Sequence, residues 1–475
     1  MKKSIILLAS LAAIAAGCTK EQPASLENGK IQVTFAAETE NAKSALDGKA
    51  ISWATKDVIA VWDGTGKNEF VYSSKSEFTG TVTANQSGTY YVVYPYYYVL
   101  KDKNGNENVV GQEFVAGDDP EMKVWTTIPS CQIATANSFA PFANLSACKA
   151  TLVDGKLCGT MTNLCGYLKF TVTDAATTPI KKIRFESLDA AKRMSGKGYI
   201  EFTEDGISAT GVDNFYVDCV PSDRQKFANG TYYLAVYPNK YSSGIKVTMI
   251  GTDGSVYETT TNSFTLARNA IANFGEITSD LLSKKTAKFA VIADFVNNNT
   301  TMPSSKPTTE TSFTVTQNNV DYNFTANCTY RGTSVSYATS AGSASTLIST
   351  HALAGKTLKE VSVSFRSHNS NNAGQFIVCT NAGYNDATTL TGRYMFGKSN
   401  STYSNTSTNG AWIAMSGEST RSTLYYSHKF TLGEKCANEA EINSGSYTAP
   451  AENTRYYICN KNGNCLIDHI ELIYE

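Results

Sequence analysis

Few residues in this 475-residue chain have the type and spacing that enzyme chemistry requires. A histidine metal site usually needs two imidazoles three or four residues apart on one face of an element. The four histidines lie far apart along the chain: His351, His368, His428 and His469. The chain also lacks a Gly-x-Ser-x-Gly elbow, a P-loop and a dinucleotide fingerprint. The sequence therefore predicts a protein that is not an enzyme and has no catalytic residues, cofactor or bound metal.

One polar loop has oxygen ligands at the spacing of a calcium-binding loop. The residues at its positions 1, 3, 5, 7 and 12 are Asp102, Asn104, Asn106, Asn108 and Glu113. Glu107 stands where that loop requires glycine for a sharp turn, and the sequence on either side is not helical. Because Asn-Gly at 104 and 105 is strong turn chemistry, we predict a polar hairpin rather than a calcium site.

A stretch near the C-terminus combines aromatic rings with amides, as a sugar-binding surface requires. Apolar sugar faces stack on rings, and sugar hydroxyls need several donors and acceptors. The candidate ligand-binding residues are Tyr394, Tyr403, Asn409, Trp412 and, from a nearby polar segment, His368. The alternative is that Trp412, within the apolar run Trp-Ile-Ala-Met, is a core aromatic residue.

The N-terminus has the layout of an export signal. Lys2 and Lys3 precede a short apolar run from 4 to 16, which is too short to span a bilayer. The run ends in Ala-Ala-Gly-Cys, which resembles a bacterial lipobox, so Cys18 is the expected lipidation site. We predict a signal peptide at 1–17 and a lipidated tether at 18–29 that anchors the protein in the membrane through its acyl chains.

Composition favours strands. Charged residues make up 17% of the chain and the formal net charge is −1, which excludes the basic surface of a nucleic-acid-binding protein. Tyrosine, phenylalanine and threonine are abundant, and short apolar–polar alternations recur, as in 31–35. The fold class that this pattern predicts is all-β.

Two similar segments, of eight and nine residues, indicate a repeated domain. Gly-Thr-Tyr-Tyr-Val-Val-Tyr-Pro at 88–95 and Gly-Thr-Tyr-Tyr-Leu-Ala-Val-Tyr-Pro at 230–238 each suit a central strand that ends at a proline. From residue 289 the chain becomes rich in Asn, Ser and Thr between short strands, which suggests a jelly roll or a similar sandwich. We expect β-sandwich domains at 30–145, 146–280 and 287–475.

The cysteines show no dense disulfide framework. Cys148, Cys158 and Cys165 lie in apolar strand-like segments, so we predict buried thiols. Cys459 and Cys465 flank a predicted Asn-Gly hairpin turn that would point them to opposite faces, and we expect no bridge between them.

The chain from Cys18 to about residue 277 resembles the fimbrillin family, the subunits and accessory proteins of type V pili. The likeness rests on the lipobox, on Trp53-x3-Asp57-x-Ile59-x-Val61 and on Phe78-Thr79-Gly80. The two Gly-Thr-Tyr-Tyr strands and the closing segment 264–275 complete it. It implies two tandem transthyretin-like Greek-key sandwiches on an outer-membrane lipoprotein with a structural or adhesive function, exposed at the surface or on a fimbria. It also implies other pilus subunits as partners through strand addition.

The chain departs from that family's pattern. Polymerising members are cut by an arginine-specific protease in the first domain, but here no arginine precedes Arg184. The domain at 287–475 is an addition, loosely similar to carbohydrate-binding jelly rolls. We therefore expect a fimbrial tip protein or a stand-alone adhesin, with a host or dietary glycan or a protein as ligand.

Two other functions stay open at this stage. One is a glycan-binding lipoprotein that assists polysaccharide capture beside a hydrolase. The other is a hydrolase in the last domain, whose two carboxylates would come from separate strands.

Overall fold

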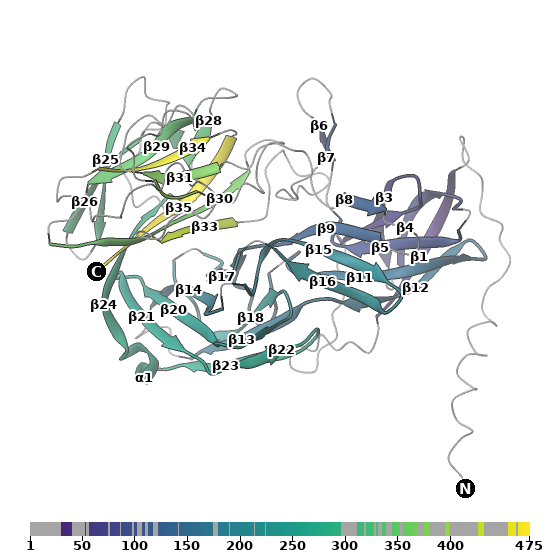
Figure 1. Ribbon diagram of the computed structural model, residues 1–475, viewed down its shortest axis with the longest axis horizontal. Helices are drawn as coiled ribbons and strands as arrows, with labels where there is room; N and C mark the ends of the chain where they lie inside the picture. The colour runs from purple at the N-terminus through teal and green to yellow at the C-terminus, as the bar shows by residue number, and fades with distance from the viewer. Residues whose placement is uncertain are drawn as a thin grey trace, which may run out of the picture. The chain divides into compact units, whose positions relative to one another are not determined.

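The computed structural model is built almost entirely of strands. It describes residues 30–39, 53, 57–74, 77–85, 87–96, 99–101, 107–109, 113–116, 122–140, 142–173, 179–189, 191–212, 214–223, 225–295, 311–317, 320–326, 329–330, 335–338, 344–351, 355–367, 375–379, 395–398, 426–431, 455–461 and 464–475. Within these residues lie strands β1 to β35 and one short helix, α1 (Ser279–Leu282) (Figure 1). The predicted all-β fold is confirmed.

The chain divides into two compact units. The first consists of residues 1–96 and 146–163, and the second of residues 97–145 and 164–475. The chain thus leaves the first unit, returns for residues 146–163 and leaves again. The segment 146–163, which we had assigned to the second domain, pairs within the first unit. The division into three sandwich domains stays a prediction.

The first unit is a closed barrel. The order around it is β1 (Lys30–Thr39), β12 (Lys156–Asn163), β11 (Ser146–Val153), β5 (Thr89–Tyr94), β2 (Val58–Trp62), β3 (Lys67–Ser74) and β4 (Glu77–Thr83). β1 closes the ring because it pairs in parallel with β12 and antiparallel with β4. Its alternating residues Val33 and Phe35 are 2% and 0% exposed in the barrel core.

The residues that carry the family resemblance in the first unit lie together in that core. The Trp53 ring packs edge-on against the rings of Phe78 and Tyr94, with both centroid distances 5.0 Å. The Tyr94 hydroxyl donates to Asp57 Oδ1 at 3.0 Å, which gives the buried hydroxyl its hydrogen bond. A Cβ at Gly80 would lie 2.4 Å from the Phe70 ring, so only glycine fits at that position. The spacing quoted from the sequence is therefore explained by packing.

The second unit begins with two facing sheets. The first sheet has the order β18 (Gly230–Val236), β13 (Gly166–Val172) and β23 (Ile271–Ile277). The second sheet is larger, and its first five strands in order are β10 (Cys131–Ile133), β17 (Tyr216–Val220), β14 (Ile180–Ser187), β20 (Ile245–Gly251) and β21 (Ser255–Thr260). Their inner faces share one core that includes Phe170, Phe185, Leu234 and Met249. Of the two strands from the similar segments, β5 is central as predicted, whereas β18 pairs only with β13 among the described strands.

Three smaller sheets complete this part of the chain. They are β16 (Gly206–Gly211), β15 (Gly196–Thr203), β9 (Met122–Ile128) and β8 (Glu113–Ala116); β19 (Asn239–Tyr241) with β22 (Phe264–Leu266); and β6 (Val99–Lys101) with β7 (Glu107–Val109). β6 and β7 pair antiparallel across residues 102–106, which confirms the hairpin predicted there. The side chains of the candidate calcium loop lie outside the described residues.

One sheet of the second unit continues into the C-terminal part of the chain, whose strands β24 to β35 we call the C-terminal sandwich. β21 pairs with β24 (Lys285–Asp294), which pairs with β35 (Asn464–Tyr474). The same sheet includes β27 (Thr329–Tyr330), β28 (Val335–Ala338), β30 (Leu358–Ser367) and β33 (Tyr426–Thr431). A six-stranded sheet has the order β25 (Thr311–Gln317), β26 (Val320–Ala326), β29 (Ala344–His351), β34 (Arg455–Lys461), β31 (Gln375–Cys379) and β32 (Met395–Lys398). Figure 1 shows the strands from β25 to β35 in green to yellow.

Two local predictions about cysteines were wrong. Cys148 and Cys165 are buried thiols as expected, but the Cys158 thiol is exposed because it lies on the outer face of β12. The hairpin between Cys459 and Cys465 does not form. β34 pairs with β29 and β31, whereas β35 pairs with β24, β28 and β30, so the chain changes sheets at that turn.

Candidate functional site

The binding residues expected from sequence cannot be placed in this fold. The expected lipidation site and all five candidate ligand-binding residues lie outside the described residues: Cys18, His368, Tyr394, Tyr403, Asn409 and Trp412. They stay predictions. Two other features of the second unit have the geometry of functional regions, namely an apolar cavity and a buried cluster of charges.

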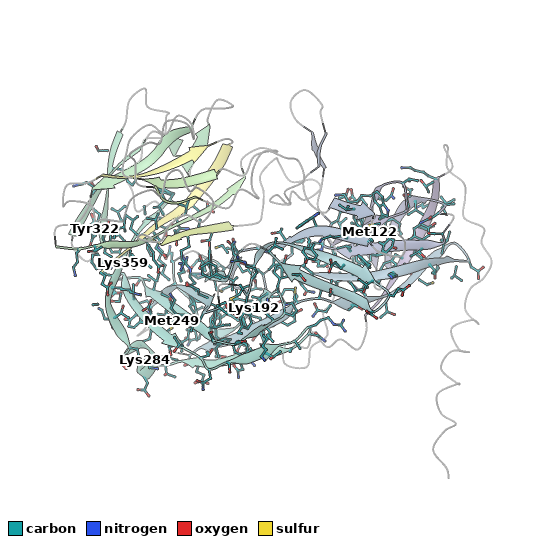
Figure 2. The ribbon with its side chains drawn as sticks, in the orientation of Figure 1. Met122, Lys192, Met249, Lys284, Tyr322 and Lys359 are labelled. Carbon is teal, nitrogen blue, oxygen red and sulfur yellow. The ribbon has the colours of Figure 1, made fainter. Side chains whose placement is uncertain are left out.

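The cavity opens into the core between β21 and β23. Its volume is about 620 Å³, within the range of about 300–1,000 Å³ typical of small-molecule pockets. Apolar side chains from both facing sheets line it, and Figure 2 shows the position of Met249 on β20. Its aromatic lining consists of Phe170, Phe185, Phe264 and Phe274. The segment 264–275, quoted above for the family resemblance, therefore forms one wall.

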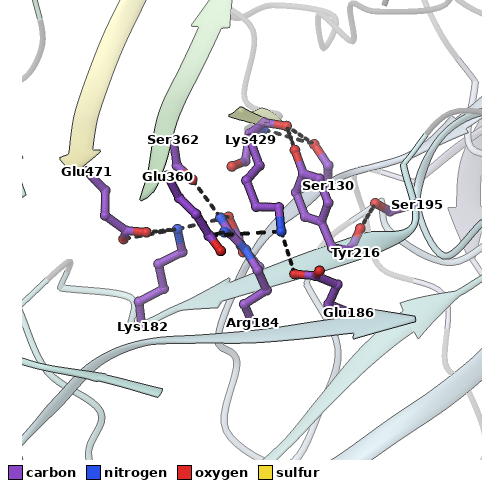
Figure 3. A network of polar contacts seen from close by, with 12 residues as sticks. Ser130, Lys182, Arg184, Glu186, Ser195, Tyr216, Glu360, Ser362, Lys429 and Glu471 are labelled. Atoms are coloured by element: carbon purple, nitrogen blue, oxygen red, sulfur yellow. Dashed lines mark hydrogen bonds and ion pairs between the residues drawn. The ribbon is translucent and has the colours of Figure 1, made fainter. Parts of the chain in front are cut away.

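The charge cluster arises from an alternating strand. In β14 the apolar residues Ile183 and Phe185 point into the sandwich core, so the charged residues 182, 184 and 186 share the opposite face. Such a face is normally wet, but here all three residues are at most 8% exposed. β30, β33 and β35 supply the side chains that cover it (Figure 3).

Every charge in this cluster has an opposite partner. Arg184 donates to both oxygens of Asp218 on β17, from Nε at 2.6 Å and Nη2 at 3.0 Å, and also to Ser362 Oγ at 2.9 Å. Lys182 Nζ lies 3.1 Å from oxygens of both Asp218 and Glu471. We call the following residues the ion cluster: Lys182, Arg184, Glu186, Asp218, Glu360, Lys429 and Glu471.

The remaining members join β14 to two strands of the C-terminal sandwich. Lys429 Nζ on β33 donates to Glu186 Oε2 at 2.7 Å and lies 3.9 Å from Glu360 Oε2 on β30. Beside it, the backbone N–H of Ser427 donates to Ser130 Oγ at 2.9 Å, and the Tyr216 hydroxyl donates to the Ser427 carbonyl at 2.7 Å. The three hydrogen bonds of this group connect residues more than 200 positions apart in the chain.

Electrostatics keep three members of the cluster charged, namely Arg184, Glu186 and Asp218. Burial alone would raise the pKa of Asp218, but Arg184 and Lys182 outweigh it and hold that pKa well below its usual range. Burial would likewise raise the pKa of Glu186, yet Lys429 and then Lys246 lower it. Burial would lower the pKa of Arg184, and Asp218 raises it well above its ordinary value. The cluster therefore contains pairs within the sheet, between β14 and β17, and pairs that join β14 to β30, β33 and β35.

The sequence contains a pattern that indicates the polar face on which this cluster lies. Residues 182–186 alternate basic, apolar, basic, apolar and acidic, and 360–364 alternate polar with valine. Periodicity identifies such a polar face but does not show whether water or another sheet covers it. Within the described part of the chain, no group of three or more His, Cys, Asp or Glu residues could hold a metal ion.

Comparison with known proteins adds likenesses over about half of the chain. No family model matches the sequence, and no curated protein matches it. A candidate cell adhesion protein from Bacteroides ovatus is 14% identical, with 51% of this chain and 91% of that chain covered and a TM-score of 0.34. One from Bacteroides uniformis is 13% identical, with 54% and 95% covered and a TM-score of 0.32.

A third solved structure is the tip fimbrial protein Mfa3 from Porphyromonas gingivalis with a C-terminal truncation. It is 12% identical, 52% of this chain and 96% of that chain are covered, and the TM-score is 0.23.

Among the described residues, the one helix, α1, is not long and apolar enough to cross a membrane.

Proposed function

We propose that this protein is a lipid-anchored surface adhesin or a fimbrial tip component, and not a polymerising shaft subunit. Polymerisation by strand addition would need one strand to leave the first barrel and another to be free for donation. The observation that carries the proposal is that both candidate strands, β1 and β24, are already paired within the chain. β1 fills the first barrel, and β24, which follows the second sandwich, lies between β21 and β35.

The first barrel supports the proposal because it has no open edge. Strand addition needs a row of unpaired backbone groups at a sheet edge. β1 pairs through Thr34–Thr39 with β12 and through Lys30–Ala36 with β4. A strand from another subunit could pair here only after β1 has left. The absence of arginine before Arg184 removes the arginine-specific cut that the family resemblance implies for that step.

β24 supports it from the other end of the second sandwich. A strand that is to be donated to a neighbouring subunit has to be released from its own fold. β24 instead pairs with β35 along Phe289–Asp294, and the ion cluster joins the same two sandwiches. The C-terminal sandwich is therefore held on its neighbour, as suits a domain that presents a binding surface.

The proposals for the membrane anchor and for the ligand of this adhesin rest on the amino-acid sequence. The lipobox cysteine Cys18 supports an anchor at the outer membrane, and the aromatic and amide residues around Trp412 suit a glycan. Substituting Trp412→Ala is expected to lower retention on an immobilised glycan while the unfolding temperature stays unchanged. Unchanged retention across a broad glycan array would remove glycan from the proposal and leave a protein ligand.

Surface display tests the proposal directly. Intact cells are treated with protease, and loss of the full-length protein is followed by immunoblotting against its C-terminal sandwich. We expect the wild-type protein to be digested, whereas a Cys18→Ala variant should be absent from the outer-membrane fraction. Immunogold microscopy then separates the two forms of the proposal, since a tip component labels fibre ends and a stand-alone adhesin labels the cell surface. Regular labelling along fibres would contradict both.

A further inference from the structure

We propose that the cavity between β21 and β23 is a binding site for an amphipathic anion with a single apolar chain, the chemistry of a long-chain fatty acid. None of the features used for the proposed function includes this cavity. The inference rests on its apolar interior, on a lysine at its mouth and on the irregular shape of the strand beside it.

The interior is apolar and held in place by ring packing. The Phe185 and Phe274 rings meet edge-on, with their centroids 4.9 Å apart. The centroid of the Phe170 ring lies 5.8 Å from that of Phe185. Ile183 and Met249 close the inner end of the cavity, and the partly exposed side chains of Ala272 and Leu281 supply accessible apolar surface. A flexible hydrocarbon chain gains from leaving water for such a surface and needs no polar partner inside.

The mouth of the cavity carries a positive charge. Lys284, which follows α1 at the outer end of the sandwich (Figure 2), is exposed and lines the cavity. Its Nζ lies 3.5 Å from Thr259 Oγ1, and among the described residues no carboxylate is within ion-pair distance of it. Hydroxyl and amide groups at 259–263 surround the same opening. A carboxylate at the end of an inserted chain would find donors and an opposite charge there.

β23 is poorly shaped for pairing with a strand from another protein. Its register against β13 shifts between Lys169 and Thr171, where Phe274 and Gly275 on β23 lie opposite the single residue Phe170. Gly275 has φ of 76°, outside the extended region, and its N–H donates to Asn273 Oδ1. A bulge of this kind bends the edge and interrupts its row of backbone groups. It also turns Phe274 toward the core, where its ring contacts Phe264 at 6.1 Å. A small amphiphile therefore fits this opening better than an added strand does.

The test measures dodecanoate binding by titration calorimetry on the chain from residue 18 to 475 carrying Cys18→Ser, so that no attached acyl chain competes. We expect saturable binding with one site, and decanoate should bind roughly tenfold more weakly because two methylenes are lost. Ala272→Trp fills the cavity from β23 and should abolish binding. Because that variant could also disturb the core, its unfolding temperature is measured in parallel.

Charge at the mouth is tested separately. Lys284→Gln should weaken dodecanoate binding by roughly threefold to tenfold and leave the binding of uncharged 1-dodecanol unchanged. The matched control is Lys240→Gln, an exposed lysine on β19 outside the cavity lining, which should change neither. The proposal is overturned if dodecanoate shows no saturable binding, if a folded Ala272→Trp variant binds normally, or if Lys240→Gln and Lys284→Gln have equal effects.

Discussion

Replacing Asp218 by asparagine removes one negative charge from the ion cluster and tests how much that cluster contributes to stability. Asp218 is 0% exposed, receives two hydrogen bonds from Arg184 and lies 3.1 Å from Lys182 Nζ. An asparagine at this position would keep the size of the side chain but remove its charge, which leaves two buried cations short of a partner. Breaking a buried pair from one side costs about 3–5 kcal/mol, so we expect that loss in the free energy of unfolding.

The measurement is denaturant unfolding of Asp218→Asn followed by tryptophan fluorescence, together with limited proteolysis at the C-terminal sandwich. The matched control is Lys359→Gln, which removes the exposed ion pair with Glu475 at 3.3 Å and should cost about 1 kcal/mol at most. The double variant Arg184→Met with Asp218→Leu removes both charges of the pair together. Its loss in the free energy of unfolding should be at least about 2 kcal/mol smaller than the summed losses of Arg184→Met and Asp218→Leu, because neither charge of the pair is left without the other. Equal losses for Asp218→Asn and the control, or fully additive single variants, would refute the reasoning.

Three further predictions concern the first unit. Phe35→Ala should destabilise the barrel by about 3–5 kcal/mol in chemical denaturation, because the ring is 0% exposed and β1 closes the sheet. Asp63 accepts five hydrogen bonds, three of them from backbone N–H groups, and its pKa is lowered to about 2 although burial alone would raise it. Because this pKa is depressed in the folded state, the ionised Asp63 carboxylate stabilises the fold above about pH 4, and this stabilisation is lost as the pH falls toward 2. Asp63→Asn should flatten that part of an acid unfolding curve and lower the free energy of unfolding at pH 7 by about 1–3 kcal/mol. Iodoacetamide at pH 8 should modify exposed Cys158 within minutes and spare buried Cys148, whose pKa burial raises; peptide mapping that shows equal labelling would contradict the placement of β12.

Much of the local structure was predictable because it depends on neighbours in sequence. Alternation identified β1, the two similar Gly-Thr-Tyr-Tyr segments identified β5 and β18, and Asn-Gly identified the β6–β7 hairpin. The motif Trp53-x3-Asp57 was quoted as a family mark, and its physical basis is contact with Phe78 and Tyr94. Periodicity succeeds for β1 because one face of that strand meets a core whichever partner it has.

Pairing partners were not predictable in the same way. Residues 146–163 read as the start of a new domain, yet they return to the first barrel and pair with β1 and β5. The turn before Cys465 read as a hairpin, but the strands on either side of it join different sheets. Strand exchange between sheets depends on contacts between residues far apart in the chain, and single-sequence patterns do not contain them.

The sequence by itself determined that this chain carries an export-type leader pattern and folds into strands, since both follow from short-range composition and alternation. Only the tertiary structure decided that the polar face of β14 is dry. Lys182, Arg184 and Glu186 look in sequence like a solvated strand face, and they become an ion cluster because β30, β33 and β35 fold over them. A charge has the same sequence signature whether water or a carboxylate from a distant strand balances it, and its energetics depend entirely on which of the two is present.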